Sequence, residues 1–245
     1  MNLPRLSLQL WSVRDDTAKD FAATVKAVAD IGYAGVETAG YGNLEAADAA
    51  QAIKDAGLVV SGMHIGIPQL RGALNAVIDE ALLCGTRDII CPLGPVDHFQ
   101  TADACRTIGA ELNEIGARLR GLGFQLHYHN HAHEIALQDG RPGIDWLLDS
   151  ATPANLSFEA DVYWVQVGGQ DPARMIREQG RRIRLIHIKD ETEIGSGPVD
   201  FPAVFAAADS VGVAEWYVIE VEKYNHAPLE SVRLSFEQMR SWGRA

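Results

Sequence analysis

The segment 126–134 holds four of the chain's eight histidines and ends in a carboxylate. In an extended strand alternate side chains point to the same face, so His127, His129 and His131 are expected to point one way. Imidazole is the commonest metal ligand and the side chain that titrates nearest to neutral pH. A row of imidazoles that ends in Glu134 therefore predicts a metal site, an acid/base site, or both.

Short runs rich in β-branched residues alternate with longer, Ala-rich runs along the whole chain. We expect eight strands, at 6–11, 35–38, 58–64, 88–91, 124–130, 156–160, 183–189 and 216–222. The expected helices cover 17–31, 44–56, 70–83, 102–122, 144–149, 172–178, 201–208 and 229–242. Eight such units in 245 residues predict an α/β fold, a single (β/α)8 TIM barrel that forms one domain over residues 1–245. A doubly wound open sheet is the alternative, but no Gly-x-Gly-x-x-Gly follows the first strand.

The active site of such a barrel lies at the carboxyl ends of its strands. Nearly every expected strand from the second onward delivers an ionisable group to that rim. In chain order these groups are Glu37, His64, the 129–134 run, Asp161, His187 with Lys189, and Glu220 with Glu222. Chance would scatter them between both ends of the barrel, so their position predicts one functional site.

Four of the rim residues are predicted to bind one divalent cation, namely Glu134, Asp161, His187 and Glu220. Three carboxylates and one imidazole suit Mn²⁺, Mg²⁺, Co²⁺ or Zn²⁺. Clustered carboxylates repel one another unless a metal or a proton lies between them. His129 competes with Glu134 as the ligand from the fifth strand, because Glu134 follows that strand on the loop. Glu134 is favoured since it adds the negative charge that a hard cation prefers.

The formal net charge is −12, with 33 Asp and Glu against 21 Lys and Arg. Nucleic-acid binding draws on clustered Lys and Arg, so this charge argues against it and suits a small polar substrate. The one dense basic run is Arg181–Arg184. Three cysteines without paired zinc spacing favour a reducing compartment. No apolar run is long enough to span a membrane and no export signal is recognisable, so we expect a cytoplasmic protein.

The chain resembles the sugar phosphate isomerase/epimerase family, the xylose-isomerase-like TIM barrels, over essentially its whole length. The segments that carry the resemblance are Gln9–Asp15, Gly32–Glu37, Tyr128–Glu134, Asp161–Trp164, Gly169–Pro172, His187–Asp190, Gly195–Phe201 and Val218–Glu220. The reading Tyr-His-Asn-His at 128–131 is similar to one subgroup of that family. Each segment alone is weak evidence, but their order and spacing together are fairly specific.

The resemblance implies one divalent metal held by groups from strands five to eight. Asp161, His187 and Glu220 match the family's ligands by position. Many members have a glutamate where this chain has His129, so the resemblance leaves the choice between His129 and Glu134 open. Family members isomerise, epimerise, dehydrate or eliminate at carbons next to a sugar or cyclitol carbonyl.

The leading hypothesis is a metal-dependent sugar or keto-sugar isomerase or epimerase. It would abstract a proton next to a carbonyl, with the metal stabilising the enediolate as a Lewis acid. The candidate catalytic residues are Glu134, Glu220 and His131, one of which would act as the base. The candidate substrate-binding residues are Glu37, His64, His129 and Lys189, which would orient hydroxyl groups, and Trp164, which would supply an apolar wall.

Three alternatives remain. The same site would also suit a dehydratase or lyase acting on a keto-inositol or a keto-glycoside. The resemblance extends to the endonuclease IV barrels that cut abasic DNA, although the net charge opposes this function. A non-catalytic sugar-binding barrel is the third alternative. The apolar face of 229–242 would suit either a homo-oligomer or ordinary packing on the barrel.

Overall fold

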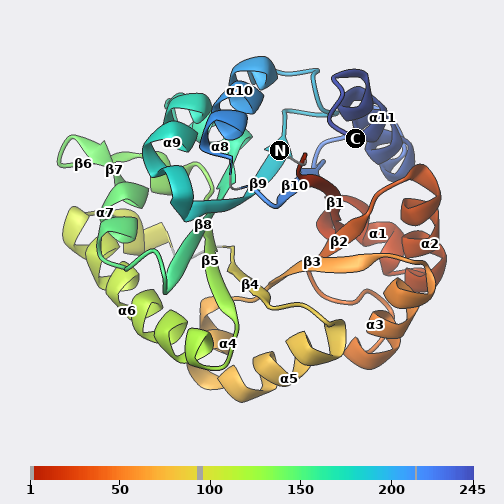
Figure 1. The fold of residues 1–245 in the computed structure, drawn as a ribbon, viewed down its shortest axis with the longest axis horizontal. Coiled ribbons are helices and arrows are strands. Elements are labelled where there is room, and N and C mark those ends of the chain that lie inside the picture. Colours follow the sequence, from red (N-terminus) through yellow and green to blue (C-terminus); the bar gives the residue numbers. More distant parts are fainter. Residues whose placement is uncertain (1–2, 93–95, 213) are drawn as a thin grey trace.

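The computed structural model describes residues 3–92, 96–212 and 214–245. Eight parallel strands close into a barrel, in the order β1-β10-β9-β8-β5-β4-β3-β2 (Figure 1). They are β1 (Arg5–Gln9), β2 (Gly35–Thr38), β3 (Val59–His64), β4 (Asp88–Cys91), β5 (Gln125–His129), β8 (Leu156–Asp161), β9 (Ile183–Lys189) and β10 (Trp216–Glu220). The predicted (β/α)8 barrel is confirmed, and the open sheet is excluded because β1 pairs with both β2 and β10.

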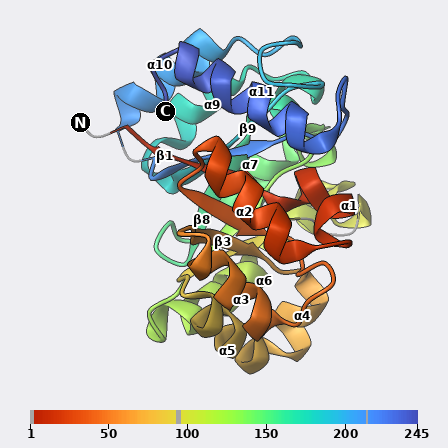
Figure 2. The same ribbon diagram turned by 90° about the vertical axis from the view of Figure 1, so that its right-hand side faces the viewer.

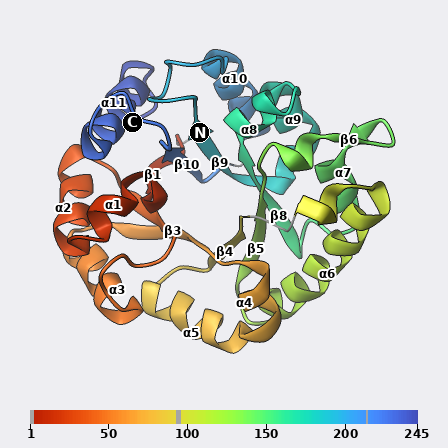
Figure 3. The same cartoon turned by 180° about the vertical axis from the view of Figure 1, so that it is seen from behind.

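Helices surround the barrel, as the views along its axis and from the side show (Figures 1 and 2). The eight main ones are α2 (Phe21–Ile31), α3 (Ala46–Asp55), α5 (Leu74–Cys84), α6 (Ala102–Gly121), α7 (Gly143–Asp149), α9 (Pro172–Gln179), α10 (Phe201–Val211) and α11 (Pro228–Ser241). Three short helices, α1 (Arg14–Thr17), α4 (Ile67–Gly72) and α8 (Val162–Val167), lie in loops that follow strands. The hairpin of β6 (Leu137–Gln138) and β7 (Arg141–Pro142) projects beside α7, as the view from behind also shows (Figure 3).

Helix boundaries follow the capping residues of the sequence. The side chains of Asp20, Asp171 and Asp200 accept hydrogen bonds from the first turns of α2, α9 and α10. These bonds satisfy backbone donors that have no partner within the helix. Gly85 and Gly212 end α5 and α10 in the left-handed conformation, which glycine adopts without steric cost.

Several predicted boundaries were wrong, including that of the helix expected at 17–31, which begins at Phe21. The first strand ends at Gln9 and not at residue 11, because the Gln9 side chain accepts a bond from the Trp11 amide and starts a 3-10 helix (Leu10–Val13). The last strand ends at Glu220 and not at residue 222. The helix expected at 70–83 is instead two helices, α4 and α5, which meet at Ala73, where the backbone leaves the helical conformation (φ −139°).

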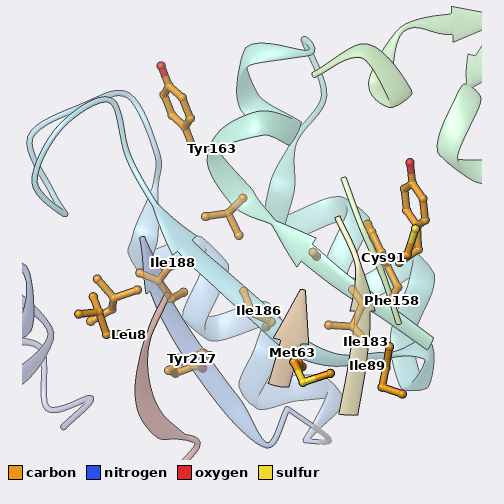
Figure 4. Packing of buried hydrophobic residues seen from close by; sticks show 14 of the residues in the cluster. Leu8, Met63, Ile89, Cys91, Phe158, Tyr163, Ile183, Ile186, Ile188 and Tyr217 are labelled. Atoms are coloured by element: carbon orange, nitrogen blue, oxygen red, sulfur yellow. The ribbon is translucent and has the colours of Figure 1, made fainter. Parts of the chain in front are cut away.

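Buried apolar residues form two clusters, one on each side of the barrel wall. The larger lies between the strands and the helices, and Figure 4 shows part of it, including Ile186, Ile188 and Tyr217. The smaller consists of Ile90, Leu185, Trp216 and Val218. Leu185 precedes His187 by two residues and Val218 precedes Glu220 by two, so each pair shares the inner face of its strand. The smaller cluster therefore fills the barrel beneath the ionisable groups.

The carboxyl-terminal helix α11 packs on the barrel of its own chain. Val232, Phe236 and Met239 are buried there, and Tyr33 donates a hydrogen bond to the Val232 carbonyl. A homo-oligomer through this face stays a prediction. Within the described ranges, no helix combines the length and the apolar character that a membrane span requires.

Gly116 is predicted to be essential to the packing of α6. A Cβ built at Gly116 would lie 1.9 Å from the Asn155 carbonyl oxygen, a backbone atom that cannot simply move aside. We expect Gly116→Ala to lower the free energy of unfolding, measured by urea denaturation, by about 1–3 kcal/mol.

The matched control is Gly121→Ala in the same helix. A Cβ there would meet no atom within 4 Å, so the change should raise stability by up to about 1 kcal/mol through helix propensity. Equal stability of the two variants would contradict the close approach.

Candidate metal centre and active site

The carboxyl ends of three neighbouring strands place three ionisable side chains together. Asp161 ends β8, His187 lies near the end of β9, and Glu220 ends β10. One ligand atom from each lies within 4.8 Å of the other two. His187 Nδ1 is 3.8 Å from Asp161 Oδ2 and 3.4 Å from Glu220 Oε2. We call Asp161, His187 and Glu220 the mouth group.

Two hydrogen bonds fix the orientation of Asp161. Its Oδ1 accepts a bond of 2.8 Å from the Trp164 amide and so caps α8. Its backbone N–H donates to Asn130 Oδ1 at 3.0 Å. Oδ2 is left buried without a hydrogen-bond partner among the described residues, on the side of His187. An unpaired buried carboxylate oxygen is costly, and a cation at the mouth group would satisfy it.

Lys189 brings a buried positive charge to the mouth. Its Nζ lies 3.3 Å from Glu220 Oε2 and 2.9 Å from Glu222 Oε2, and 5.6 Å from the centre of the Trp164 ring. Burial opposes the charge on Glu220, but Lys189 and His187 outweigh it and lower the pKa of Glu220 to about 2. The Glu220 carboxylate is therefore ionised at neutral pH.

A second set of side chains lies around the other nitrogen of His187. His187 Nε2 is 2.8 Å from Glu37 Oε1 and 3.4 Å from Glu159 Oε2. His64 Nε2 is 2.8 Å from the same Glu37 oxygen and 3.4 Å from the same Glu159 oxygen. His129 Nδ1 lies 3.1 Å from Glu159 Oε2. We call Glu37, His64, His129 and Glu159 the deep group; all but His64 are almost completely buried.

The deep group brings two carboxylates together with two imidazoles in a largely buried place. Burial and the neighbouring Glu37 raise the pKa of Glu159 to about 7. Burial disfavours a charged His64, but Glu37 and Glu159 outweigh this and raise the pKa of His64 to about 9. Burial likewise raises the pKa of Asp161 to about 7. These shifts mean that Glu159 and Asp161 hold a proton more readily than exposed carboxylates do.

Glu134, predicted as a ligand and as a base, lies apart from both groups. It is fully buried, and its two oxygens accept bonds from the Tyr128 hydroxyl (2.8 Å) and the His131 amide (2.9 Å). Neither set of convergent ligand atoms among the described residues includes it. His131 lies beside the mouth instead, with its ring 5.0 Å from that of His129 and 5.9 Å from that of Trp164.

The structure adds three residues that the sequence analysis missed. Glu159 precedes Asp161 by two positions, and the alternation that paired His187 with Lys189 would have identified it. Asn130 fixes the backbone of Asp161, and Gln9 donates a bond of 2.8 Å to Glu37 Oε1. These two act through contacts between neighbouring strands, whose pairing the sequence does not show.

The loop after β9 holds a Gly-Ser-Gly segment at 195–197 whose amides point at a carboxylate of the chain itself. Asp190 Oδ2 accepts bonds from the amides of Gly195 (3.1 Å) and Gly197 (2.9 Å). Backbone amides of this kind bind phosphate where they are free. Here Asp190 takes up both donors.

The basic run at 181–184 also has structural partners. Arg182 donates to the carbonyl oxygens of Leu148 and Ala151, and Arg184 pairs with Glu215. These contacts hold the start of β9 to neighbouring elements.

The donor set fits a divalent cation. The mouth group offers two carboxylates and one imidazole, a mixed O/N set that suits Mn²⁺, Mg²⁺, Co²⁺ or Zn²⁺. Asp161 Oδ2 and His187 Nδ1, which belong to this group, are both buried and have no hydrogen-bond partner in the described part of the chain. Asp161, His187 and Glu220 are thus brought together, as the sequence led us to expect.

The fold and the site together define the class of protein. It is a closed (β/α)8 barrel with carboxylates and imidazoles at the carboxyl ends of its strands. The family model of the xylose isomerase-like TIM barrel matches residues 25–242. The chain belongs to this family, which confirms the resemblance read from the sequence.

Individual relatives are distant. An inosose dehydratase of Geobacillus thermodenitrificans is 26% identical over 136 residues, which cover 46% of this chain and 45% of that protein. The chain thus spans about half the length of the curated relatives it matches. A sugar phosphate isomerase/epimerase from Parabacteroides distasonis superposes with a TM-score of 0.87 at 23% identity, over 98% of this chain and 97% of the other.

A D-allulose 3-epimerase from Methylomonas sp., solved in complex with D-allulose, superposes with a TM-score of 0.76 at 13% identity, over 99% of this chain and 98% of the other. At these identities the two structural likenesses show the fold.

Glu193 ties two loops of the mouth together, and we predict that this makes stability depend on acid pH. Its carboxylate accepts bonds from Ser231 Oγ (2.6 Å), the Asn225 amide (2.9 Å) and Asn225 Nδ2 (2.7 Å). Burial opposes the charge, but these bonds outweigh it and lower the pKa of Glu193 to about 2. Because the pKa is lowered on folding, the stabilisation is complete above the unfolded pKa of about 4.3 and is lost as pH falls towards 2.

The variant Glu193→Gln should therefore have a free energy of unfolding about 1–3 kcal/mol below that of the parent at pH 7. The difference should shrink between pH 5 and pH 3, measured by urea denaturation at each pH. A difference that stays constant over this range would contradict the role of the Glu193 charge.

Proposed function

We propose that the protein is a divalent-metal-dependent isomerase or epimerase of a sugar or keto-sugar, acting by proton transfer at a carbon next to a carbonyl. The observation that carries the proposal is the mouth group, in which Asp161, His187 and Glu220 converge within 4.8 Å beside a buried lysine. Membership in the xylose isomerase-like family supports a reaction of this kind.

Asp161, His187 and Glu220 would hold the cation, whose role when bound is that of a Lewis acid for a carbonyl and a neighbouring hydroxyl. Asn130 would keep the Asp161 backbone in place. Glu134 could act as the strand-five ligand only if its carboxylate left the Tyr128 hydroxyl and the His131 amide. His129 already lies next to His187, with a distance of 4.4 Å between the ring centres. We therefore favour His129 over Glu134 as the neighbour of the cation.

Residues that border the mouth group would carry out the proton transfer. Burial lowers the pKa of His131 to about 4, so its imidazole is neutral and able to accept a proton at pH 7. Lys189, held between Glu220 and Glu222, would donate hydrogen bonds to oxygens that gain negative charge. Trp164 would bound the substrate on the apolar side.

The sugar is proposed to be unphosphorylated. The amides of Gly195 and Gly197, which would suit a phosphate, donate to Asp190 instead. The net charge of −12 also disfavours anionic ligands and nucleic acid. A solved relative of the same fold is named for its complex with a neutral sugar, D-allulose.

A second candidate reaction is the elimination of water from a keto-inositol or a related keto-sugar. The curated relatives named as inosose dehydratases favour it, although the matched segment covers about half of their length. Elimination starts with the same proton abstraction, so the same residues would serve both reactions.

The metal requirement is tested with Asp161→Asn. This variant keeps an oxygen that can cap α8 but loses a charged ligand, so we expect both bound Mn²⁺ and turnover to fall by at least about 100-fold. Bound metal is measured by elemental analysis after gel filtration. The matched control is Asp171→Asn, which changes the residue that caps α9 and should leave metal and turnover unchanged. Full activity of metal-free Asp161→Asn protein would refute the proposal.

The reaction type is tested by NMR of candidate ketoses and keto-inositols in D₂O with Mn²⁺. We expect one deuteron to enter at the carbon next to the carbonyl, with a product of otherwise unchanged composition. Loss of water from the product would identify a dehydratase. Tight sugar binding without exchange at any carbon would identify a non-catalytic binding barrel.

A further inference from the structure

The deep group crowds three imidazoles around a single carboxylate oxygen. Three imidazole nitrogens, from His64, His129 and His187, surround one oxygen of Glu159 at 3.4, 3.1 and 3.4 Å. The other oxygen of Glu159 is buried and has no hydrogen-bond partner in the described part of the chain. A carboxylate that only accepted hydrogen bonds would share the donors between its two oxygens, at about 2.9 Å each.

The same spacing is the one that ligands adopt around a metal ion. Bonds of about 2.0–2.1 Å in a tetrahedral arrangement place the ligand atoms about 3.3 Å apart. One ligand atom from each of His64, His129, Glu159 and His187 lies within 4.8 Å of the other three. The four residues come from the four strands β3, β5, β8 and β9, so the folded barrel alone brings them together.

We propose that the deep group is a second cation site, separate from the mouth group, with His64 Nε2, His129 Nδ1 and Glu159 Oε2 as its ligands. His187 forms the wall between the two sites, because its Nδ1 faces Asp161 and Glu220 and its Nε2 faces Glu159 and Glu37. Glu37 Oε1, which is 2.8 Å from His64 Nε2, lies close enough to complete the coordination.

The ligands select the class of cation. Two imidazoles and one carboxylate with an open position are the set that proteins use for catalytic Zn²⁺ and for related first-row ions. The mouth group has more oxygen ligands and suits Mn²⁺ or Mg²⁺. A divalent cation would also offset the negative charge of the Glu37 and Glu159 carboxylates, which are both fully buried.

The deep site has a path to the outside. The His64 side chain is 12% exposed, whereas those of Glu37 and Glu159 are 0% exposed. A cation would therefore enter from the mouth past His64, while Gln9 holds Glu37 from the far side. A Cβ built at Gly62 would meet both the Ile90 side chain and Glu37 Oε2, so these two side chains pack against the same glycine.

The test counts bound ions in the full-length protein. Metal-free protein is incubated with excess Zn²⁺ or Co²⁺, passed through gel filtration and analysed for metal. We expect about two equivalents for the parent chain, about one for His64→Gln and for Glu159→Gln, and about one for Asp161→Asn. In the Co²⁺ form, the visible absorption of the deep site should vanish in His64→Gln and persist in Asp161→Asn.

The matched control is His127→Gln, two residues before His129 on the same strand. His127 is fully buried but bonds Asp88 at 2.8 Å, outside both groups, so this variant should keep both equivalents. Circular dichroism and melting of each metal-free variant show that it is folded. His64→Gln and Glu159→Gln act from different strands, so their agreement separates loss of a ligand from a local packing defect.

Each result decides one question. One equivalent in the parent chain that His64→Gln leaves unchanged would overturn the deep site and keep the metal at the mouth group. In that case His64 shares a proton between Glu37 and Glu159 and the deep group binds no ion. The parent chain could also bind a single equivalent that is lost in His64→Gln and kept in Asp161→Asn. That result would place the cation in the deep group, and it would overturn both the two-site proposal and the proposed role of the mouth group. No bound ion in any protein would refute both.

Discussion

The rest of the structure depends on the burial of several carboxylates and imidazoles at one end of a barrel. Buried carboxylates repel one another and are costly to remove from water unless positive charge lies among them. Glu37, Glu159 and Asp161 are fully buried. Lys189 supplies one positive charge, and its contacts are with Glu220 and Glu222. The remaining carboxylates face imidazoles, which are the side chains best able to hold either a proton or a metal ion.

Apolar burial in the rest of the barrel offsets the free-energy cost of burying these charged groups. Beneath the ionisable groups the interior is filled by Ile90, Leu185, Trp216 and Val218, and outside the wall a continuous apolar layer joins strands to helices. Burial of each large apolar side chain contributes about 1.5–3 kcal/mol, which offsets the cost of the polar mouth. The close approach of Gly116 to the Asn155 carbonyl lets α6 pack directly against the backbone that leads into β8.

Much of this could be predicted from the sequence because strand alternation and strand ends are local properties. Asp161, His187 and Glu220 were identified because the carboxyl ends of parallel strands meet at one rim, and the structure brings them together. Glu134 was favoured as a ligand for its charge, yet its place depends on where the loop after β5 folds. That loop turns back so that Glu134 meets the Tyr128 hydroxyl, and no periodicity in the sequence encodes this turn.

Residues that act through a neighbouring strand could not be predicted from the sequence, for a different reason. Gln9 and Glu37 lie on neighbouring strands, and Asn130 reaches the backbone of Asp161 on the next strand. These pairings depend on the register of strands in the closed sheet, which includes an irregularity between Val36 and Glu37. A single residue of slippage would turn Glu37 away from the barrel interior. The ionisable side chains at the rim could therefore be predicted from the sequence, whereas their hydrogen-bond partners could not.

The register also determines which nitrogen of His187 faces the mouth group. Glu37 Oε1 lies 2.8 Å from His187 Nε2 and also accepts a bond from Gln9 Nε2, while Gln9 Oε1 accepts the Trp11 amide at 3.0 Å. A carboxylate in this position favours a proton on Nε2, and the lone pair is then at Nδ1, which faces Asp161 and Glu220. Since the Trp11 amide belongs to the loop at the rim, hydrogen bonds from Trp11 through Gln9 to Glu37 link the rim to the position of the carboxylate beside His187 Nε2.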